Sequence, residues 1–193
     1  MRRMIVAGVL LAVIGLTVGC GTVRETLPGR SATEQFLIST AADRAVDGLQ
    51  LTPCEGKAVF IDPANLDAFD KPYVLQRMRD GVLANGGRVV GKAEEAEVVL
   101  QIASGALSVN RRDYMVGLPS VPMPIPNVGT VQSPELALFK IVLSKGRAKL
   151  LVSAVDPKTG GRLWPVPTGY GLARTNFWWL LLTGPYKWTD VPE

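Results

Sequence analysis

The sequence predicts a single α/β domain with a mixed β-sheet, parallel at its start and antiparallel at its end, with helices packed on the sheet. Three observations predict it: a capped amphipathic helix at 31–49, a strand–helix–strand pattern over 57–107, and closely spaced turn residues from 134 to 164. Two strands joined through a helix by short links form a right-handed crossover and lie parallel. We therefore expect residues 31–193 to form one domain.

The first helix begins at a capping box, Ser31-Ala-Thr-Glu34. The Ser31 hydroxyl can accept a hydrogen bond from the backbone of Glu34, while the Glu34 carboxylate accepts one from the backbone of Ser31. Small and apolar residues then recur at helical spacing, which predicts a helix over 32–49. The residues expected on its buried face are Ile38, Ala42, Ala45 and Leu49.

A strand is predicted at 57–62, and Pro72 begins a second helix because a first-turn residue needs no N–H donor. Gly86-Gly87 ends that helix, and strands are predicted at 88–90 and 97–107. The apolar face of the helix is expected to comprise Val74, Met78 and Val82, with Leu75 beside them.

Four prolines in the segment 118–127 predict an extended segment outside any sheet ladder. After it, turn residues at short spacing predict an antiparallel meander. Its expected parts are a strand at 134–143, a turn at 144–146, a strand at 149–155, a turn at 156–160 and a strand at 162–164.

Composition excludes several functional classes. Histidine is absent, so the usual general base and the commonest metal ligand are missing. A serine nucleophile would need a lysine or carboxylate base, and the adjacent Ser144 and Lys145 point apart. The formal charge is +4, and the lysines and arginines form no long basic block of the kind that binds nucleic acid. We expect no enzyme activity, catalytic residue, metal or cofactor, and we expect Cys54 to be a buried thiol.

Aromatic residues cluster near the C-terminus, and they are the first candidate binding surface. Aromatic side chains are enriched at protein interfaces and at membrane–water boundaries, although rings packed in the core would give the same pattern. The apolar residues between the prolines could extend the surface. The residues predicted to bind a partner, either another envelope protein or a second copy, are Trp178, Trp179, Trp188, Val121, Met123 and Ile125.

Three aspartates form the second candidate. Asp62, Asp67 and Asp70 follow the first predicted strand, at the sheet edge where α/β proteins often bind ligands. Their spacing does not fit an EF-hand calcium loop. A small-ligand or cation site is therefore the alternative function, and turn or helix-cap roles are the structural explanation for the same residues.

The N-terminus has a basic start, an apolar run of about 15 residues, and then Leu16-Thr17-Val18-Gly19-Cys20. The run resembles a secretory signal peptide and is shorter than a spanning helix. Its end resembles the lipobox of bacterial lipoproteins, except that Thr17 stands where leucine is favoured. The resemblance implies a signal peptide at 1–19, a lipid on Cys20 and a tether at 20–30. An ordinary cleaved signal and an uncleaved anchor are the alternatives.

Four phrases of the chain resemble an uncharacterised family of bacterial lipoproteins: 31–35, 39–44, 134–139 and 156–160. More distantly, the order of elements is similar to the α/β domain of the curli-secretion channel lipoproteins, without the residues that build the channel. Gly21 follows Cys20 in place of the aspartate that retains lipoproteins at the inner membrane. These resemblances imply a lipid-anchored envelope protein at the outer membrane, facing the periplasm.

Overall fold

The computed structural model of the protein describes residues 29–126, 129–181 and 183–192. The chain divides into two compact units, Met1–Arg30 and Ser31–Glu193, and the elements described below all belong to the second. In chain order these elements are α2 (Ala32–Asp47), η1 (Thr52–Cys54), β1 (Ala58–Asn65), α3 (Lys71–Ala84), β2 (Arg88–Val89), η2 (Ala93–Glu95), β3 (Val98–Leu118), β4 (Pro122–Ile125), β5 (Gly129–Gln132), β6 (Leu136–Val155), β7 (Arg162–Trp164), β8 (Gly169–Leu180) and β9 (Thr183–Thr189).

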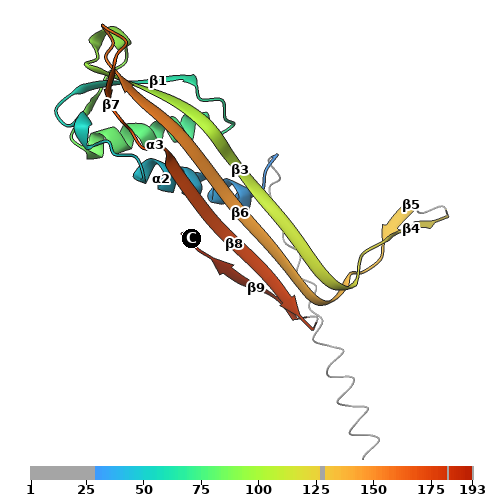
Figure 1. Ribbon diagram of the computed structural model, residues 1–193. Coiled ribbons are helices and arrows are strands. Elements are labelled where there is room, and N and C mark those ends of the chain that lie inside the picture. Colours follow the sequence, from blue (N-terminus) through green and yellow to red (C-terminus); the bar gives the residue numbers. More distant parts are fainter. Residues whose placement is uncertain (1–28, 127–128, 182, 193) are drawn as a thin grey trace, which may run out of the picture. The chain divides into compact units, whose positions relative to one another are not determined.

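Seven strands of the described residues form one mixed sheet in the order β2-β1-β3-β6-β8-β9, with β7 paired to the end of β6 (Figure 1). β1 runs parallel to both β2 and β3, whereas β3, β6, β8 and β9 are antiparallel to their neighbours. This confirms the predicted α/β class with a parallel start and an antiparallel end. β4 and β5 form a separate hairpin in the connection between β3 and β6.

The predicted capping box is present at the start of α2. The Ser31 backbone N–H donates to Glu34 Oε2 at 3.0 Å, and the Glu34 backbone N–H donates to Ser31 Oγ at 3.3 Å. Each bond satisfies a donor that the first helical turn would otherwise leave unpaired. The helix ends at Asp47, two residues before the predicted limit, and Gly48 is its C-cap.

Pro72 lies in the first turn of α3, as predicted. Val74, Met78 and Val82 form the buried face of this helix, and each is fully buried. α3 is also joined to α2 by polar contacts. Arg77 Nε lies 3.4 Å from Asp43 Oδ1 and also forms an ion pair with Asp47 through its guanidinium group. The Tyr73 hydroxyl donates to Asp43 Oδ1 at 2.9 Å. Together these contacts fix the position of α3 relative to α2.

The two faces of the sheet differ in what covers them. α2 packs on β6 and β8, so closely that a Cβ atom at Gly146 or Gly171 would overlap a carbonyl oxygen of the helix. Successive side chains of a strand point to opposite faces of the sheet. Leu150 is therefore fully buried beneath the helices, while the neighbouring Leu151 is 52% exposed on the other side. We call these the helix-covered face and the open face. Figure 1 shows β3 and β6 continuing past the helices to the hairpin.

The predicted turn at 144–146 is wrong, because β6 is one continuous strand of 20 residues through that point. Ser144, Lys145 and Gly146 pair in register with Arg111, Asn110 and Val109 of β3. Gly146 has a different function from the one predicted: it leaves room for the backbone of α2 at Leu37. A glycine required for close approach of a helix therefore gave the same sequence signal as a turn glycine.

The predicted non-ladder segment at 118–127 is also wrong in part. β3 extends to Leu118 instead of ending at 107, and Pro122 and Pro124 both lie within β4. β4 pairs only with β5, so one of its edges is unpaired. Because the N–H groups of alternate residues point away from the partner strand, two prolines two residues apart can both occupy positions that donate no ladder bond.

Tyr73 gives a prediction that tests the junction of α2 and α3. Burial, followed by the hydrogen bond to Asp43, raises the pKa of Tyr73 from 10.0 to about 12. The folded state therefore keeps this proton at a pH where the unfolded chain loses it, so the stabilisation is complete below pH 10 and is lost as the pH rises towards 12. A tyrosinate absorbance titration should show one high-pH step that Tyr73→Phe removes and Tyr170→Phe retains. Persistence of the step in Tyr73→Phe would assign it to another tyrosine.

Candidate functional site

The far half of the open face, towards the hairpin, is apolar and aromatic. Tyr114, Ile141, Trp178 and Tyr186 occupy one row across β3, β6, β8 and β9, each paired with the next in register. The rings of Trp178 and Tyr186 stack with their centroids 4.5 Å apart. Trp178 is 37% exposed and Tyr114 is 51% exposed. These rings form a surface row, not a buried core.

The adjacent rows extend the apolar surface. Val116, Phe139 and Leu180 form the next row towards the hairpin, and Trp188 lies in the row on the other side, where it pairs with Asn176. Contiguous exposed apolar side chains are uncommon on monomeric proteins and mark interaction sites. We define the aromatic patch as Tyr114, Val116, Phe139, Ile141, Trp178, Leu180, Tyr186 and Trp188.

Trp179 does not belong to this patch, although the sequence grouped it with Trp178 and Trp188. Successive side chains of β8 point to opposite faces, so Trp179 lies on the helix-covered face with Phe177. The Lys140 amine lies 5.5 Å from the centroid of the Trp179 ring. The structure therefore brings two of the three predicted tryptophans together and separates the third.

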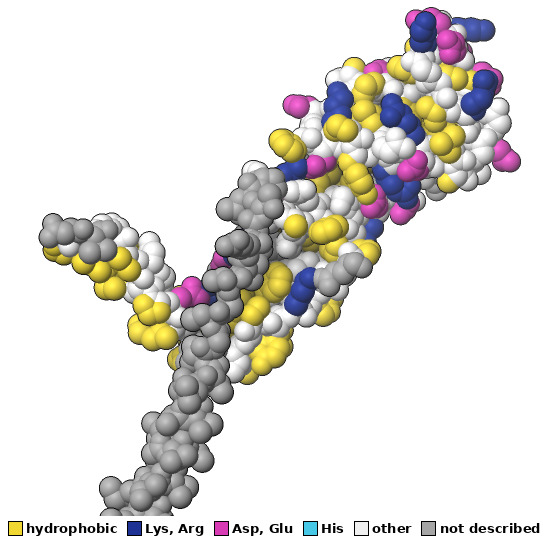
Figure 2. All heavy atoms as spheres, turned by 180° about the vertical axis from the view of Figure 1, so that it is seen from behind, with side chains coloured by type: hydrophobic (Ala, Val, Ile, Leu, Met, Phe, Trp, Pro, Cys, Tyr) yellow, Lys and Arg dark blue, Asp and Glu magenta, His cyan; other side chains and the backbone are white. Residues whose placement is uncertain are grey.

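The apolar residues between the prolines gather on the β4–β5 hairpin. Val121, Met123 and Ile125 alternate along the chain and are exposed, and Met123 pairs with the exposed Val131 of β5. Figure 2 shows hydrophobic side chains along one side of the hairpin. Because residues two apart in a strand share a face, these four side chains form a single apolar strip.

The other half of the open face, which lies away from the hairpin and which we call the near half, is basic. Lys145 pairs with Asn110 of β3 and with Arg174 of β8, and Arg147 and Lys149 follow at alternate positions of β6. Asp113 is the only acidic residue in the described strands β3, β6, β8 and β9, and it lies on the helix-covered face, bonded to Arg111 at 3.0 Å. We call Arg112, Lys145, Arg147, Lys149 and Arg174 the basic belt.

A small hollow lies within the basic belt. Its volume is about 80 Å³, and it is lined by Asn110, Arg112, Leu143, Lys145 and Arg147. Further along the belt, the Lys149 amine lies 5.7 Å from the ring of Tyr170. Sequence reasoning identified two C-terminal cations for anionic headgroups, Lys187 and Arg174, and of these only Arg174 belongs to the belt. Lys145, Arg147 and Lys149 alternate in the sequence, which in a strand places them on one face. The incorrect prediction of a turn at 144–146 prevented this interpretation.

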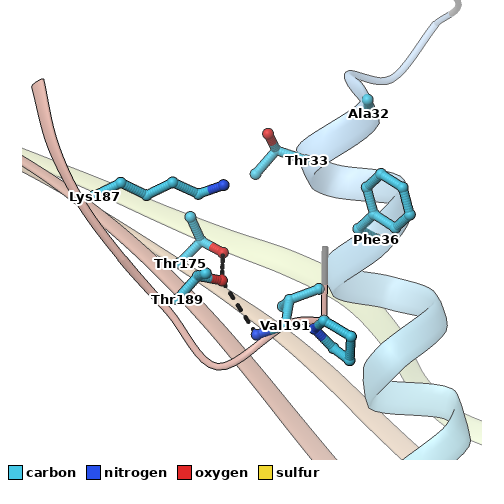
Figure 3. A pocket seen from close by; sticks show the side chains of 8 residues that line it. Ala32, Thr33, Phe36, Thr175, Lys187, Thr189 and Val191 are labelled. Atoms are coloured by element: carbon cyan, nitrogen blue, oxygen red, sulfur yellow. Dashed lines mark hydrogen bonds between the residues drawn. The ribbon is translucent and has the colours of Figure 1, made fainter.

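A larger pocket of about 350 Å³ lies between the start of α2 and the C-terminal strand (Figure 3). The Thr175 and Thr189 hydroxyls are 2.7 Å apart on one wall, and the Val191 backbone N–H donates to Thr189 at 3.1 Å. Figure 3 shows the Lys187 side chain extending across the pocket towards α2, where Phe36 forms part of the wall. The hydroxyl groups thus serve the structure by joining β8 and β9.

The three candidate aspartates are not brought to one point. Asp62 Oδ1 accepts the backbone N–H of Ala64, and the backbone oxygen of Asp67 accepts the Ser104 hydroxyl. Asp70 precedes α3 and lines a hollow of about 370 Å³ that contains neither Asp62 nor Asp67. Among the described residues, no group of three acidic, histidine or cysteine side chains could hold a metal ion.

The Family of unknown function (DUF6655) matches residues 13–191 of this sequence. The chain belongs to this family. No curated protein matches it. The DUF6655 match covers both the described sheet and part of the N-terminal segment that resembles a lipoprotein signal.

In this DUF6655 chain the side chains considered for nucleophilic chemistry are separated or shielded. Ser144 is 7% exposed on the helix-covered face, whereas Lys145 points to the open face. Cys54 is fully buried as predicted, and burial raises the pKa of its thiol, which disfavours the reactive thiolate. Cys20 lies outside the described residues. No helix in the described part of the chain is long and apolar enough to cross a membrane.

Proposed function

We propose that this protein is a non-enzymatic envelope lipoprotein that binds a protein partner through the aromatic patch and the hairpin strip. The observation that supports this proposal is the aromatic row of the open face, in which Tyr114, Trp178 and Tyr186 are exposed in register. The aspartate loop is a weaker candidate, since Asp70 alone of its three carboxylates lines a hollow.

The chemistry of the patch suits protein binding. Trp and Tyr present large, rigid surfaces and dominate the energetics of protein interfaces, with each aromatic side chain burying about 150–250 Å². Five aromatic side chains are exposed in the patch: Tyr114, Phe139, Trp178, Tyr186 and Trp188.

The membrane attachment is proposed from the sequence. Cys20 follows a lipobox-like segment, and a cysteine bearing more than one acyl chain would hold the domain stably at a membrane. Gly21 in place of aspartate favours the outer membrane, with the domain in the periplasm. In this proposal the lipid attaches the domain to the membrane, and the open face binds the partner.

Crosslinking in intact cells tests the proposed partner. We expect the wild-type chain to give a crosslinked product that Trp178→Ala reduces by at least tenfold, as for an interface anchor worth about 2 kcal/mol. Leu83→Ala is the matched control, because Leu83 is an apolar residue of α3 that is 54% exposed away from the open face. Recovery of monomer alone from wild type, or equal loss in both variants, would contradict the proposal.

A further inference from the structure

We infer that the basic belt is a second recognition site, which binds the phosphate groups of anionic lipid headgroups in the membrane that carries the protein. The inference rests on the lipid anchor of the proposed function, but it concerns a different part of the open face. The belt includes Lys145, Arg147 and Lys149 in the near half of β6, whereas the aromatic patch lies in the far half.

The first argument is charge. Lys145 and Arg174 are directly paired neighbours on β6 and β8, and Arg147 is two residues from Lys145 on the same face. Like charges on adjacent strands repel each other and destabilise a sheet. The strands β3, β6, β8 and β9 place no carboxylate on this face, because Asp113 lies on the other side with Arg111. The arrangement is therefore complementary to an external anion.

The second argument is the chemistry of the hollow. Two arginines, Arg112 and Arg147, line the hollow together with Lys145, the polar Asn110 and the apolar Leu143. Guanidinium groups bind phosphate oxygens through paired hydrogen bonds, and the charge on both partners makes these bonds stronger than neutral ones. Asn110, Arg112 and Arg147 are exposed on the sheet surface, so a phosphate attached to a larger body can reach this hollow of about 80 Å³.

The third argument identifies a lipid surface as the source of the phosphate. The belt from Lys145 to Lys149 spans roughly 13 Å of strand, which exceeds a single phosphate group and fits an extended anionic surface. The segment from Cys20 to Ser31 can reach at most about 40 Å when extended. A domain tethered within that distance can bring the belt into contact with the membrane surface.

Lysine acylation of the full-length lipidated protein in vesicles tests the inference. We expect Lys145 and Lys149 to react more slowly in vesicles containing phosphatidylglycerol than in pure phosphatidylcholine, and the difference to disappear at high salt. Lys92 and Lys158 are exposed lysines outside β3, β6, β8 and β9, and they should react equally in both. Mass spectrometry of the acylated peptides reports each site separately.

The variant Arg112→Ser/Arg147→Ser should reduce the protection of Lys145 by roughly fivefold for each guanidinium removed, as expected for single charges at an anionic membrane surface. Arg79→Ser/Arg88→Ser removes the same charge from exposed positions on α3 and β2, and it should leave the protection unchanged. Equal loss in both double variants would mean that total charge, and not the belt, causes the protection.

Three further results would overturn the inference. Equal reactivity of Lys145 in the two kinds of vesicle would exclude headgroup binding. Protection in both kinds that increases with protein density would identify a second copy as the occupant. Equal protection by inorganic phosphate in neutral vesicles would indicate a small-anion site instead. Failure of the protein to float with phosphatidylcholine vesicles would contradict the lipid anchor, a separate result from any change at Lys145.

Discussion

Gly171→Ala is expected to lower the free energy of unfolding by about 3 kcal/mol or more, at the upper end of the cost of overpacking. The added methyl group would overlap the carbonyl oxygen of Ala41 and lie 2.7 Å from its carbonyl carbon. Both atoms belong to the backbone of α2, so relief requires the whole helix to move away from β8. Because glycine normally weakens a strand, alanine would stabilise the protein if the site had room, and the sign of the effect is therefore decisive.

Gly91→Ala is the control for this substitution. A Cβ atom at Gly91 would meet no heavy atom within 4 Å, so alanine should change stability by less than about 0.5 kcal/mol. Denaturant unfolding followed by circular dichroism measures both variants. If Gly171→Ala proves too unstable to purify, the same measurement on Gly146→Ala, which would meet Leu37 of α2, gives the second test. A neutral Gly171→Ala would contradict the close packing of α2 on β8.

Leu150→Ala is expected to destabilise the protein by about 3 kcal/mol, within the range of 2–5 observed for buried leucines. Leu150 is fully buried beneath the helices at the centre of the core, which includes Leu100, Ile102 and Val152. Truncation removes apolar contacts and leaves a cavity that rigid neighbours fill only partly.

Leu151→Ala is the matched control, because it changes the same residue type at the next position of the same strand. Leu151 is 52% exposed on the open face, so its truncation should cost less than about 1 kcal/mol. Comparable losses from the two variants would mean that the open face is covered in solution, by a second copy or by other residues. The pair of variants therefore tests directly whether the surface that carries both proposals is exposed.

The beginning of the domain was predictable from local chemistry. The capping box at Ser31 and Glu34 and the first-turn proline at Pro72 act within a few residues of chain, so their signals do not depend on distant contacts. The end of the domain was less predictable. Gly146 resembles a turn residue in the sequence, and Pro122 resembles a residue outside any sheet ladder. The structure at each depends on neighbours in space: α2 over Gly146, and the unpaired edge of β4 at Pro122.

The candidate surfaces were likewise predictable only in part from the sequence. The sequence located the aromatic cluster at the C-terminus and the apolar residues between the prolines. Assigning each ring to a face requires the strand register, because a shift of one residue exchanges the two faces. Trp178 and Trp179 are adjacent in the sequence and lie on opposite sides of the sheet for this reason. The basic belt combines residues of β3, β6 and β8, so no local pattern contains all of it.

By itself, the sequence determined the α/β class, the capped first helix, the buried thiol at Cys54 and the parallel start of the sheet. These features follow from periodicity, capping and burial preferences, which act over one or two turns of chain. Only the tertiary structure decided that β6 is continuous, that α2 rests on glycines, and that aromatic and basic side chains share an open face. Such features depend on pairing between residues distant in the chain, and that pairing is a property of the folded sheet.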